Sequence, residues 1–396
     1  MRPHLARTAA ALTVLTLLPL AMGGSAHASP AVLPQSSGMM GESPPEFSPR
    51  SSPLFASFDY DGGQVLGTYV QFAYDAANGT LRSVLGLAGE MPVLYVGSIS
   101  IEGFAPARGQ TTEGATFEAD GYLVTVTAHD DPTVLIEIRT DMARTATIEL
   151  PAAATNISLL AASGSWPAST VSYAVGEEQG RFLLGAGSFS VSGTRLVAKM
   201  MDSDLLVFKS VPPLAPNRTE WRLVLDSITL GHVVAELDLV ATSNGQWAQN
   251  TVRYRIGLAA WALRVEPGKA VVQVDSLLPG GGVILLAFDA ATMPNDGTRH
   301  LVVKANGHEV NGTDDSLMIL FPSDLRQGGA RYSVLALPGT VVALYLPSLA
   351  AISVEVQSVR PAPSNTSFGV ANEIAMIAAL AVVSAAAARM LWRRED

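Results

Sequence analysis

Most of this chain consists of short runs of Val, Ile, Leu, Thr and aromatic residues, each broken after a few positions by Gly, Asn, Asp or Pro. Runs in which apolar and polar residues alternate are typical of strands buried on one face. The clearest are "TVLIEIRTD", "TATIEL", "RLVLDSI", "VVAELDLVA", "NTVRYRIGL" and "AISVEVQSV". No stretch of the body stands out with a helical period over three turns. We therefore predict an all-β fold of two or three β-sandwich or Ig-like domains.

Dipeptides with strong turn chemistry separate several of these runs. Asn78-Gly79, Asp120-Gly121 and Asn306-Gly307 each predict a β-hairpin, because Asn, Asp and Gly accept the positive φ of tight hairpin turns. The uncharged segment Ser333–Val354 is long enough to compete as a membrane span. Pro338-Gly339 interrupts it, so we predict two buried strands around a turn.

The N-terminus has the features of a secretory signal peptide at residues 1–28. Arg2 and Arg7 precede an apolar run, and Ala26-His27-Ala28 fits the small-residue pattern of a cleavage site. The mature chain is expected to begin near Ser29.

The C-terminus carries a second apolar segment, at residues 374–392. As a helix it spans about 28 Å, close to the hydrocarbon thickness of a bilayer. The alternative is a packed C-terminal helix, but the segment lacks the polar stripe that such a helix shows. Arg389, Arg393 and Arg394 lie at its end, where the positive-inside rule places the cytoplasm. We predict a single-pass plasma membrane protein with its body extracellular and residues 393–396 as a cytoplasmic tail.

Between the two ends the chain divides into four expected parts. Residues 29–53 are rich in Pro and Ser and predict a disordered leader. Residues 54–257 predict one or more larger β domains, residues 258–360 an Ig-like sandwich, and residues 361–373 a juxtamembrane linker. Two segments compete as the boundary between the domains, Val211–Thr219 and the turn at Glu266.

Composition restricts the classes of partner and of site. The net charge of −10 argues against nucleic acid. The absence of cysteine excludes disulfides, thiolate metal sites and a cysteine nucleophile. Asn-x-Ser/Thr sequons are frequent, and they predict a glycosylated surface, with ordinary turn chemistry as the alternative. The candidate glycosylation sites are Asn78, Asn156, Asn217, Asn311 and Asn365.

Few residues indicate chemistry. Asp59 and Asp61 alternate along an extended segment before two glycines, which suits Ca²⁺, although the closing Glu of a full calcium loop is missing. His129, Asp130 and Asp131 could bind a cation or exchange protons, but Asp before Pro is also ordinary turn chemistry at a strand end. The sequence lacks a serine-hydrolase elbow, a Walker loop and a Rossmann glycine pattern. We predict no catalytic residues and no cofactor other than this candidate calcium.

The runs "EPGKAVVQVD", "HLVVKANGHEV" and "ARYSVLALPGTVVALYLPSLAAISVEVQSV" resemble the β module that precedes the anchor in uncharacterised archaeal surface proteins. "FAYDAANGTLRSVLGL" and "VTAHDDPTVLIEI" are similar to the N-terminal part of such proteins. The resemblance implies a secreted, C-terminally membrane-anchored protein with β-sandwich modules, and it brings no known activity. The Pro-Gly-Phe sorting motif of many such proteins is absent, which favours a retained span.

These observations predict a non-enzymatic, glycosylated cell-surface protein for adhesion, envelope structure or display of a binding surface. Its partners would be the membrane, through the C-terminal helix, and a protein or glycan at the cell surface. Two alternatives remain. One is an anchored extracellular hydrolase of polysaccharide or peptide, with carboxylates from distant strands. The other is an accessory subunit of a membrane complex, because Ala378, Ala381, Ala385 and Ala388 give the predicted span a small-residue face.

Overall fold

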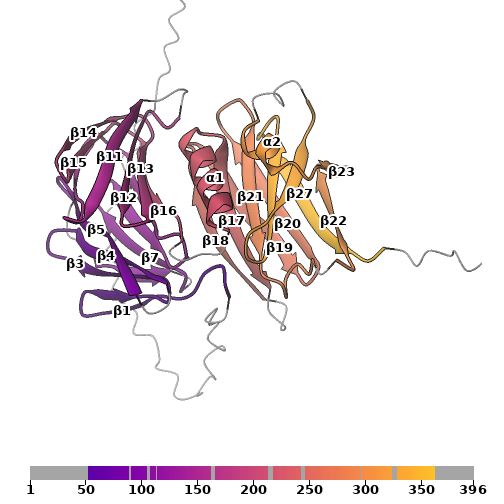
Figure 1. Ribbon diagram of the computed structural model, residues 1–396, viewed down its shortest axis with the longest axis horizontal. Helices are drawn as coiled ribbons and strands as arrows, with labels where there is room; N and C mark the ends of the chain where they lie inside the picture. Colours follow the sequence, from indigo (N-terminus) through magenta and orange to yellow (C-terminus); the bar gives the residue numbers. More distant parts are fainter. Residues whose placement is uncertain are drawn as a thin grey trace, which may run out of the picture. The chain divides into compact units, whose positions relative to one another are not determined.

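The computed structural model describes residues 52–361, with gaps at residues 89–90, 105–107, 113, 162–165, 213–216, 242–245, 296 and 323–327. Strands make up 59% and helices 6% of the described residues. The strands form four sheets, which we name A to D (Figure 1). The predicted all-β class with sandwich-like layers is therefore confirmed.

Several predictions fall on other parts of the chain. Outside the described residues lie the signal peptide at residues 1–28, the span at residues 374–392, the tail at residues 393–396 and Asn365. The same holds for nearly all of the leader at residues 29–53 and of the linker at residues 361–373. Among the residues that are described, no helix has the length and hydrophobicity that crossing a bilayer requires.

Sheets A and B each contain eight antiparallel strands. Across sheet A the strands are β1 (Asp59–Asp61), β2 (Gln64–Leu66), β3 (Val70–Asp75), β4 (Thr80–Ala88), β5 (Met91–Ile101), β10 (Arg144–Glu149), β15 (Arg195–Met200) and β14 (Ser188–Ser192). Across sheet B they are β11 (Ala154–Ala161), β12 (Ser169–Val175), β13 (Glu178–Leu184), β16 (Asp204–Ser210), β9 (Leu135–Thr140), β8 (Val124–His129), β7 (Thr116–Gly121) and β6 (Gln110–Thr112).

Sheets C and D are smaller and come from the second half of the chain. Across sheet C the strands are β18 (Trp247–Arg253), β17 (Val233–Ala241), β21 (Gly282–Phe288), β26 (Thr340–Leu346), β25 (Arg331–Leu335) and β24 (Asn311–Gly312). Across sheet D they are β19 (Leu258–Glu266), β20 (Lys269–Ser276), β27 (Ile352–Val359), β22 (His300–Ala305) and β23 (His308–Glu309). The pairs β17–β21 and β24–β25 are parallel.

Three apolar clusters hold these layers together. The first draws its side chains from sheets A and B, the second from sheets B and C with the two helices, and the third from sheets C and D. Sheets B and C therefore bury both faces. In β16, Leu206 and Phe208 belong to the first cluster, whereas Leu205 and Val207 belong to the second. This double burial explains why every residue of β16, β21 and β26 is buried and why each strand contains a continuous apolar run rather than an alternating one.

The change from sheets A and B to sheets C and D occurs between β16 and β17, and the candidate boundary Val211–Thr219 lies in this interval. The predicted division between residues 257 and 258 does not coincide with it. That position separates β18 from β19, and both strands belong to the sandwich of sheets C and D. A short turn joins β18 to β19, as it joins other consecutive strands, and a turn of this kind in the sequence does not distinguish a domain boundary from a connection within a domain.

Two of the three predicted hairpin turns lie where the sequence places them. Asn78-Gly79 connects β3 to β4, and Asn306-Gly307 connects β22 to β23 with φ of 49° and 80°. The third prediction, a turn at Asp120-Gly121, is wrong by two residues. Both residues belong to β7, and the turn is made by Tyr122 and Leu123, the latter with φ of 55°. The predicted pair of strands around Pro338-Gly339 is confirmed as β25 and β26.

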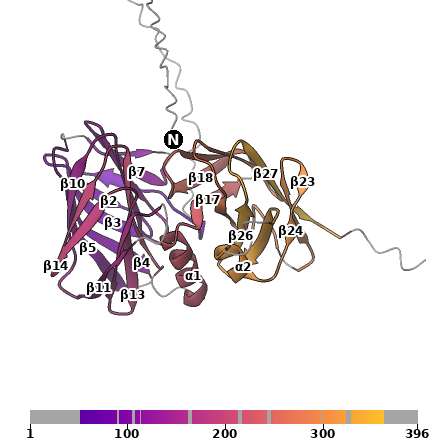
Figure 2. The ribbon, with the colours of Figure 1, turned by 90° about the horizontal axis from the view of Figure 1, so that it is seen from above.

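The predicted strand "RLVLDSI" is wrong, because these residues lie in helix α1 (Arg218–Thr229). Val224, Leu225 and Ile228 are its buried apolar residues, which is helical spacing rather than alternation. The helix contacts β17 of sheet C (Figure 2). Arg181 of β13 in sheet B bonds to Asp226 and to the last turn of the helix. A second, short helix, α2 (Ser316–Leu320), begins at Asp315, whose carboxylate accepts from the Met318 N–H.

Candidate functional site

The candidate calcium ligands lie on an edge strand. Asp59 and Asp61 are the two ends of β1, the outermost strand of sheet A, and both are exposed. They share one face of the strand, as alternate positions must. Among the described residues no three His, Asp or Glu side chains are grouped so that they could hold a metal ion. The calcium site therefore stays a prediction.

The four described sequon asparagines are all exposed, but their side chains differ in what they contact. In the β3–β4 turn, Asn78 donates to Asp75 Oδ2 at 3.0 Å and accepts from Thr80 N–H at 3.1 Å. Asn217, at the start of α1, donates its Nδ2 to the Ala336 carbonyl at 2.5 Å. Asn156 and Asn311 lie on strands at the edges of their sheets. Turn chemistry thus accounts for Asn78, and Asn156 and Asn217 have the positive φ, 54° and 59°, that Asn accepts more readily than most residues.

The most polar part of the interior is the segment Ala128–Pro132, at the end of β8. The sequence allowed two interpretations, a turn or a cluster that binds a cation or exchanges protons. A turn does follow β8, and Val134 within it has φ of 41°. However, His129, Asp130 and Asp131 are only 2%, 0% and 5% exposed. Such burial requires partners for each polar atom, and the partners come from distant strands.

Asp130 fastens the N-terminal part of sheet A to β8. Its carboxylate accepts hydrogen bonds from the backbone N–H groups of Thr68, Tyr69 and Val70, at 2.8, 2.7 and 3.0 Å. Burial raises the pKa of Asp130 to about 6, and the three N–H groups counteract this rise. Gly67 leaves the room for this carboxylate, because a Cβ there would lie 2.4 Å from Asp130 Oδ1.

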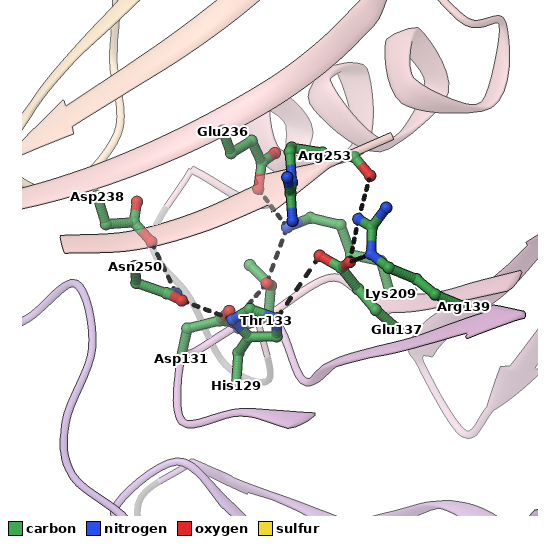
Figure 3. A network of polar contacts seen from close by, with 10 residues as sticks. All are labelled: His129, Asp131, Thr133, Glu137, Arg139, Lys209, Glu236, Asp238, Asn250 and Arg253. Atoms are coloured by element: carbon green, nitrogen blue, oxygen red, sulfur yellow. Dashed lines mark hydrogen bonds and ion pairs between the residues drawn. The ribbon is translucent and has the colours of Figure 1, made fainter. Parts of the chain in front are cut away.

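His129 connects sheet B to Asn250 and Asp238 of sheet C, and it lies beside the Glu137–Arg139 pair of its own sheet (Figure 3). Its Nδ1 donates to Asn250 Oδ1 on β18 at 2.5 Å, and the Asn250 amide donates to Asp238 Oδ2 at 3.2 Å. On the other side, His129 Nε2 lies 3.6 Å from Glu137 Oε1. Glu137 also pairs with Arg139, at 2.5 and 3.1 Å. The Nδ1 end of the imidazole is therefore hydrogen-bonded, whereas the Nε2 end lies near a carboxylate but beyond hydrogen-bond distance.

Lys209 forms the second connection between the sheets. Its Nζ lies 2.7 Å from Glu236 Oε2 on β17 and donates to Thr133 Oγ1 at 2.9 Å. The Thr133 hydroxyl donates to Asp131 Oδ1 at 2.5 Å, so the turn after β8 is part of the same network. The side chains of Lys209 and Glu236 are only 3% and 12% exposed. The pair is a buried salt bridge rather than a surface one.

The charges within this polar network shift the pKa values of His129, Glu137 and Lys209 in the directions that favour their charged forms, and the pKa of Asp238 in the opposite direction. Burial would lower the pKa of His129, but the Glu137 carboxylate, Asp131 and Asn250 raise it above its ordinary value. Burial would raise the pKa of Glu137, but Arg139 and His129 hold it down at about 2. For Lys209 burial is again opposed, and Glu236 and Asp131 leave the pKa raised. For Asp238, burial and the charges of Asp131 and Glu236 raise the pKa well above the ordinary value.

This arrangement can bind two sheets together but cannot reach a substrate. The side chains of His129 and Glu137 are 3% and 5% exposed, so the acid and base that resemble a catalytic pair are closed to solvent. A buried network of this kind adds little net stability compared with apolar residues, but it specifies which surfaces meet and in which register. We therefore interpret this network as a connection between sheets B and C and name it the interior lock. It consists of His129, Asp131, Thr133, Glu137, Arg139, Lys209, Glu236, Asp238 and Asn250.

Sequence reasoning found His129, Asp130 and Asp131 but missed their partners. Lys209, Glu236 and Asp238 each interrupt a run that is otherwise apolar, in "DLLVFKS" and "VVAELDLVA". A charged residue in such a strand is rarely buried unless it is paired, so the pattern does indicate partners. It does not say which residues they are.

Comparisons with known proteins add no family. No family model matches the chain, and no curated protein matches it. Among solved structures, the chain has a low similarity to an active YidC insertase crystal structure with the first transmembrane domain resolved. The TM-score is 0.26 at 9% identity, over 44% of this chain and 46% of that one, so the match spans less than half of the insertase. A likeness this low supports no inference about fold or function.

Proposed function

We propose that this chain is a non-enzymatic, glycosylated protein of the cell surface that holds a rigid β body outside the plasma membrane. Its role would be adhesion, envelope structure or display of a binding surface, with the predicted helix at residues 374–392 as its anchor. The single observation that carries the proposal is the interior lock. In this network His129, Glu137 and Lys209 are buried and join sheet B to sheet C, which suits a support rather than an active site.

The second half of the body fits the module expected next to an anchor. Sheets C and D form a sandwich of short antiparallel strands with two parallel pairs, and we propose that it is the Ig-like module, extended by α1, β17 and β18. β27 is the last described strand, and it leads to Pro361. The chain that would form the linker and the span follows directly after this module.

One hollow among the described residues bears on the hydrolase alternative and does not favour it. A hollow of about 530 Å³ lies beside β10 and β15, and its lining includes Glu102, Arg144 and Lys199. Glycoside hydrolysis uses two carboxyl groups about 5–10 Å apart. This hollow has one carboxylate beside two cations, and the guanidinium of Arg144 already donates to the carbonyls of Glu102 and Tyr122.

Labelling of intact cells with a membrane-impermeant amine reagent tests the proposed location. Lys199 is exposed, whereas Lys209 is 2% exposed and serves as an internal control for folding. We expect Lys199 to be labelled on intact cells and Lys209 to remain unlabelled until the protein is denatured. If Lys199 is labelled only after lysis, the body is not outside and the proposal fails.

The absence of enzymatic activity is tested separately, on detergent-solubilised full-length protein incubated with cell-envelope polysaccharide and with a peptide library. We expect no turnover and a specific retained partner. Turnover that is lost when Glu102 is changed to Gln would favour the hydrolase, whereas co-purification of a stoichiometric membrane protein would favour the accessory subunit.

A further inference from the structure

The edge of sheet B at β11 lacks the charged side chains that the other long edge strands among the described residues have. Each sheet ends in strands with unpaired backbone groups, which invite pairing with another chain. Among the described edge strands longer than five residues, β18 carries Arg253 and β19 carries Arg264 and Glu266. β11 has eight residues, "ATNISLLA", without a charge or a proline.

This edge also exposes large apolar side chains. Leu159 is 50% exposed and Leu160 is 42% exposed. Because consecutive residues of a strand point to opposite faces, the strand is open on both sides at this place. An uncharged edge with exposed leucines is the kind of segment that soluble β proteins usually cover, bend or charge.

Asn156 lies at the bend of this strand. Asn156 and Ile157 together oppose the single residue Tyr173 of β12, which makes a β-bulge, and Asn156 takes the left-handed conformation with φ of 54°. Ile157 packs against the first apolar cluster, whereas Asn156 is exposed. Within the described part of the chain its amide makes no hydrogen bond, unlike those of Asn78 and Asn217.

We propose that Asn156 carries an N-linked glycan and that this glycan covers the free edge of β11. The sequon Asn156-Ile157-Ser158 supplies the acceptor, and Asn156 is exposed at the bulge, where its amide makes no hydrogen bond within the described part of the chain. Leu159 lies three residues further on, about 10 Å along the strand, which is within reach of a short oligosaccharide. The glycan would replace the charge that protects β18 and β19. The inference rests on the proposed exported location, since it needs a glycosylated chain.

Mass spectrometry of the full-length protein from its own membranes tests the modification. We expect a glycan on Asn156 in the peptide between Arg144 and Arg181. If Asn311 carries sugar and Asn156 does not, the inference is overturned but the proposed function stands. If no sequon carries sugar, both the inference and the glycoprotein part of the proposed function fail.

The covering role is tested with variants of the full-length protein in detergent, using light scattering after size exclusion. We expect Asn156→Gln to give a several-fold larger fraction of dimers and higher assemblies, and Asn156→Gln/Leu159→Lys to restore the monomer by placing a charge on the edge. Asn311→Gln, which removes a sequon from the two-residue strand β24, is the matched control and should change nothing. An Asn156→Gln protein that has the wild-type unfolding midpoint and remains monomeric would overturn the proposal.

Discussion

The buried pair Lys209–Glu236 allows a quantitative test of the interior lock. Their charged atoms are 2.7 Å apart. At an effective dielectric constant of about 20 the direct attraction is about 6 kcal/mol, before the cost of removing both groups from water. Changing Lys209 to Met leaves the Glu236 carboxylate buried beside Asp131 and Asp238, and we expect a loss of about 3–5 kcal/mol in the free energy of unfolding. Glu236→Leu should cost a similar amount, because it leaves the ammonium group unpaired.

The double variant Lys209→Met/Glu236→Leu gives the more informative result. Replacing both charges with apolar residues of similar size removes the desolvation cost together with the attraction, so we expect stability within about 2 kcal/mol of the wild type. The coupling energy from the double-mutant cycle would then be several kcal/mol. Urea unfolding followed by far-UV circular dichroism measures all four proteins.

An exposed pair in the same protein is the matched control. Arg264 and Glu266 are 2.5 Å apart, but their side chains are 61% and 42% exposed. Arg264→Met should therefore cost less than about 1 kcal/mol. The reasoning is refuted if Lys209→Met is no more costly than Arg264→Met, or if the double variant loses the sum of the two single losses.

Two further predictions concern the same region. The pKa of Glu137 is held at about 2, below its ordinary value of 4.5, so the ionised carboxylate stabilises the folded state above pH 4.5. This contribution to the free energy of unfolding is about 3 kcal/mol, and it is lost as the pH falls from 4.5 to about 2. Urea titrations across this window should show the loss in the wild type and a shallower slope in Glu137→Gln; equal slopes would contradict the assignment. Gly67→Ala should destabilise the protein by more than about 1 kcal/mol in thermal unfolding, because the added Cβ would displace the Asp130 carboxylate. Gly329→Ala is the control and should leave the unfolding midpoint unchanged, because its added Cβ would have no atom within 4 Å.

Strands that bury one face were predictable from the sequence, because alternation reports the position of the core directly. The run "AISVEVQSV" coincides with β27, and the turns at Asn78-Gly79 and Asn306-Gly307 follow from residues that accept positive φ. Helix α1 was missed because a seven-residue window of mixed residues fits either period. Its apolar spacing becomes visible only when Trp221 and Ile228 are considered together.

The interior lock could not be assembled from the sequence. His129 and Asn250 are 121 residues apart, and Lys209 and Glu236, which also lie on different sheets, are 27 residues apart. Their meeting depends on how sheet B packs against sheet C, and local patterns carry no information about that. What the sequence does contain is the anomaly, a charge inside an apolar strand. Such a charge predicts that a partner exists without naming it.

The strand order of the sheets has a consequence for how the polypeptide is completed during synthesis. β16 is inserted between β9 and β13, although it follows both in the chain, and β27 occupies the middle of sheet D although it is the last described strand. Neither sandwich can therefore close until its final strand has left the ribosome. Until then the flanking strands present open edges and apolar faces, a state in which β chains bind holding factors or aggregate. A chain truncated just before residue 352 would thus lack the central strand of sheet D, and we expect it not to fold into a shorter form of the same sandwich.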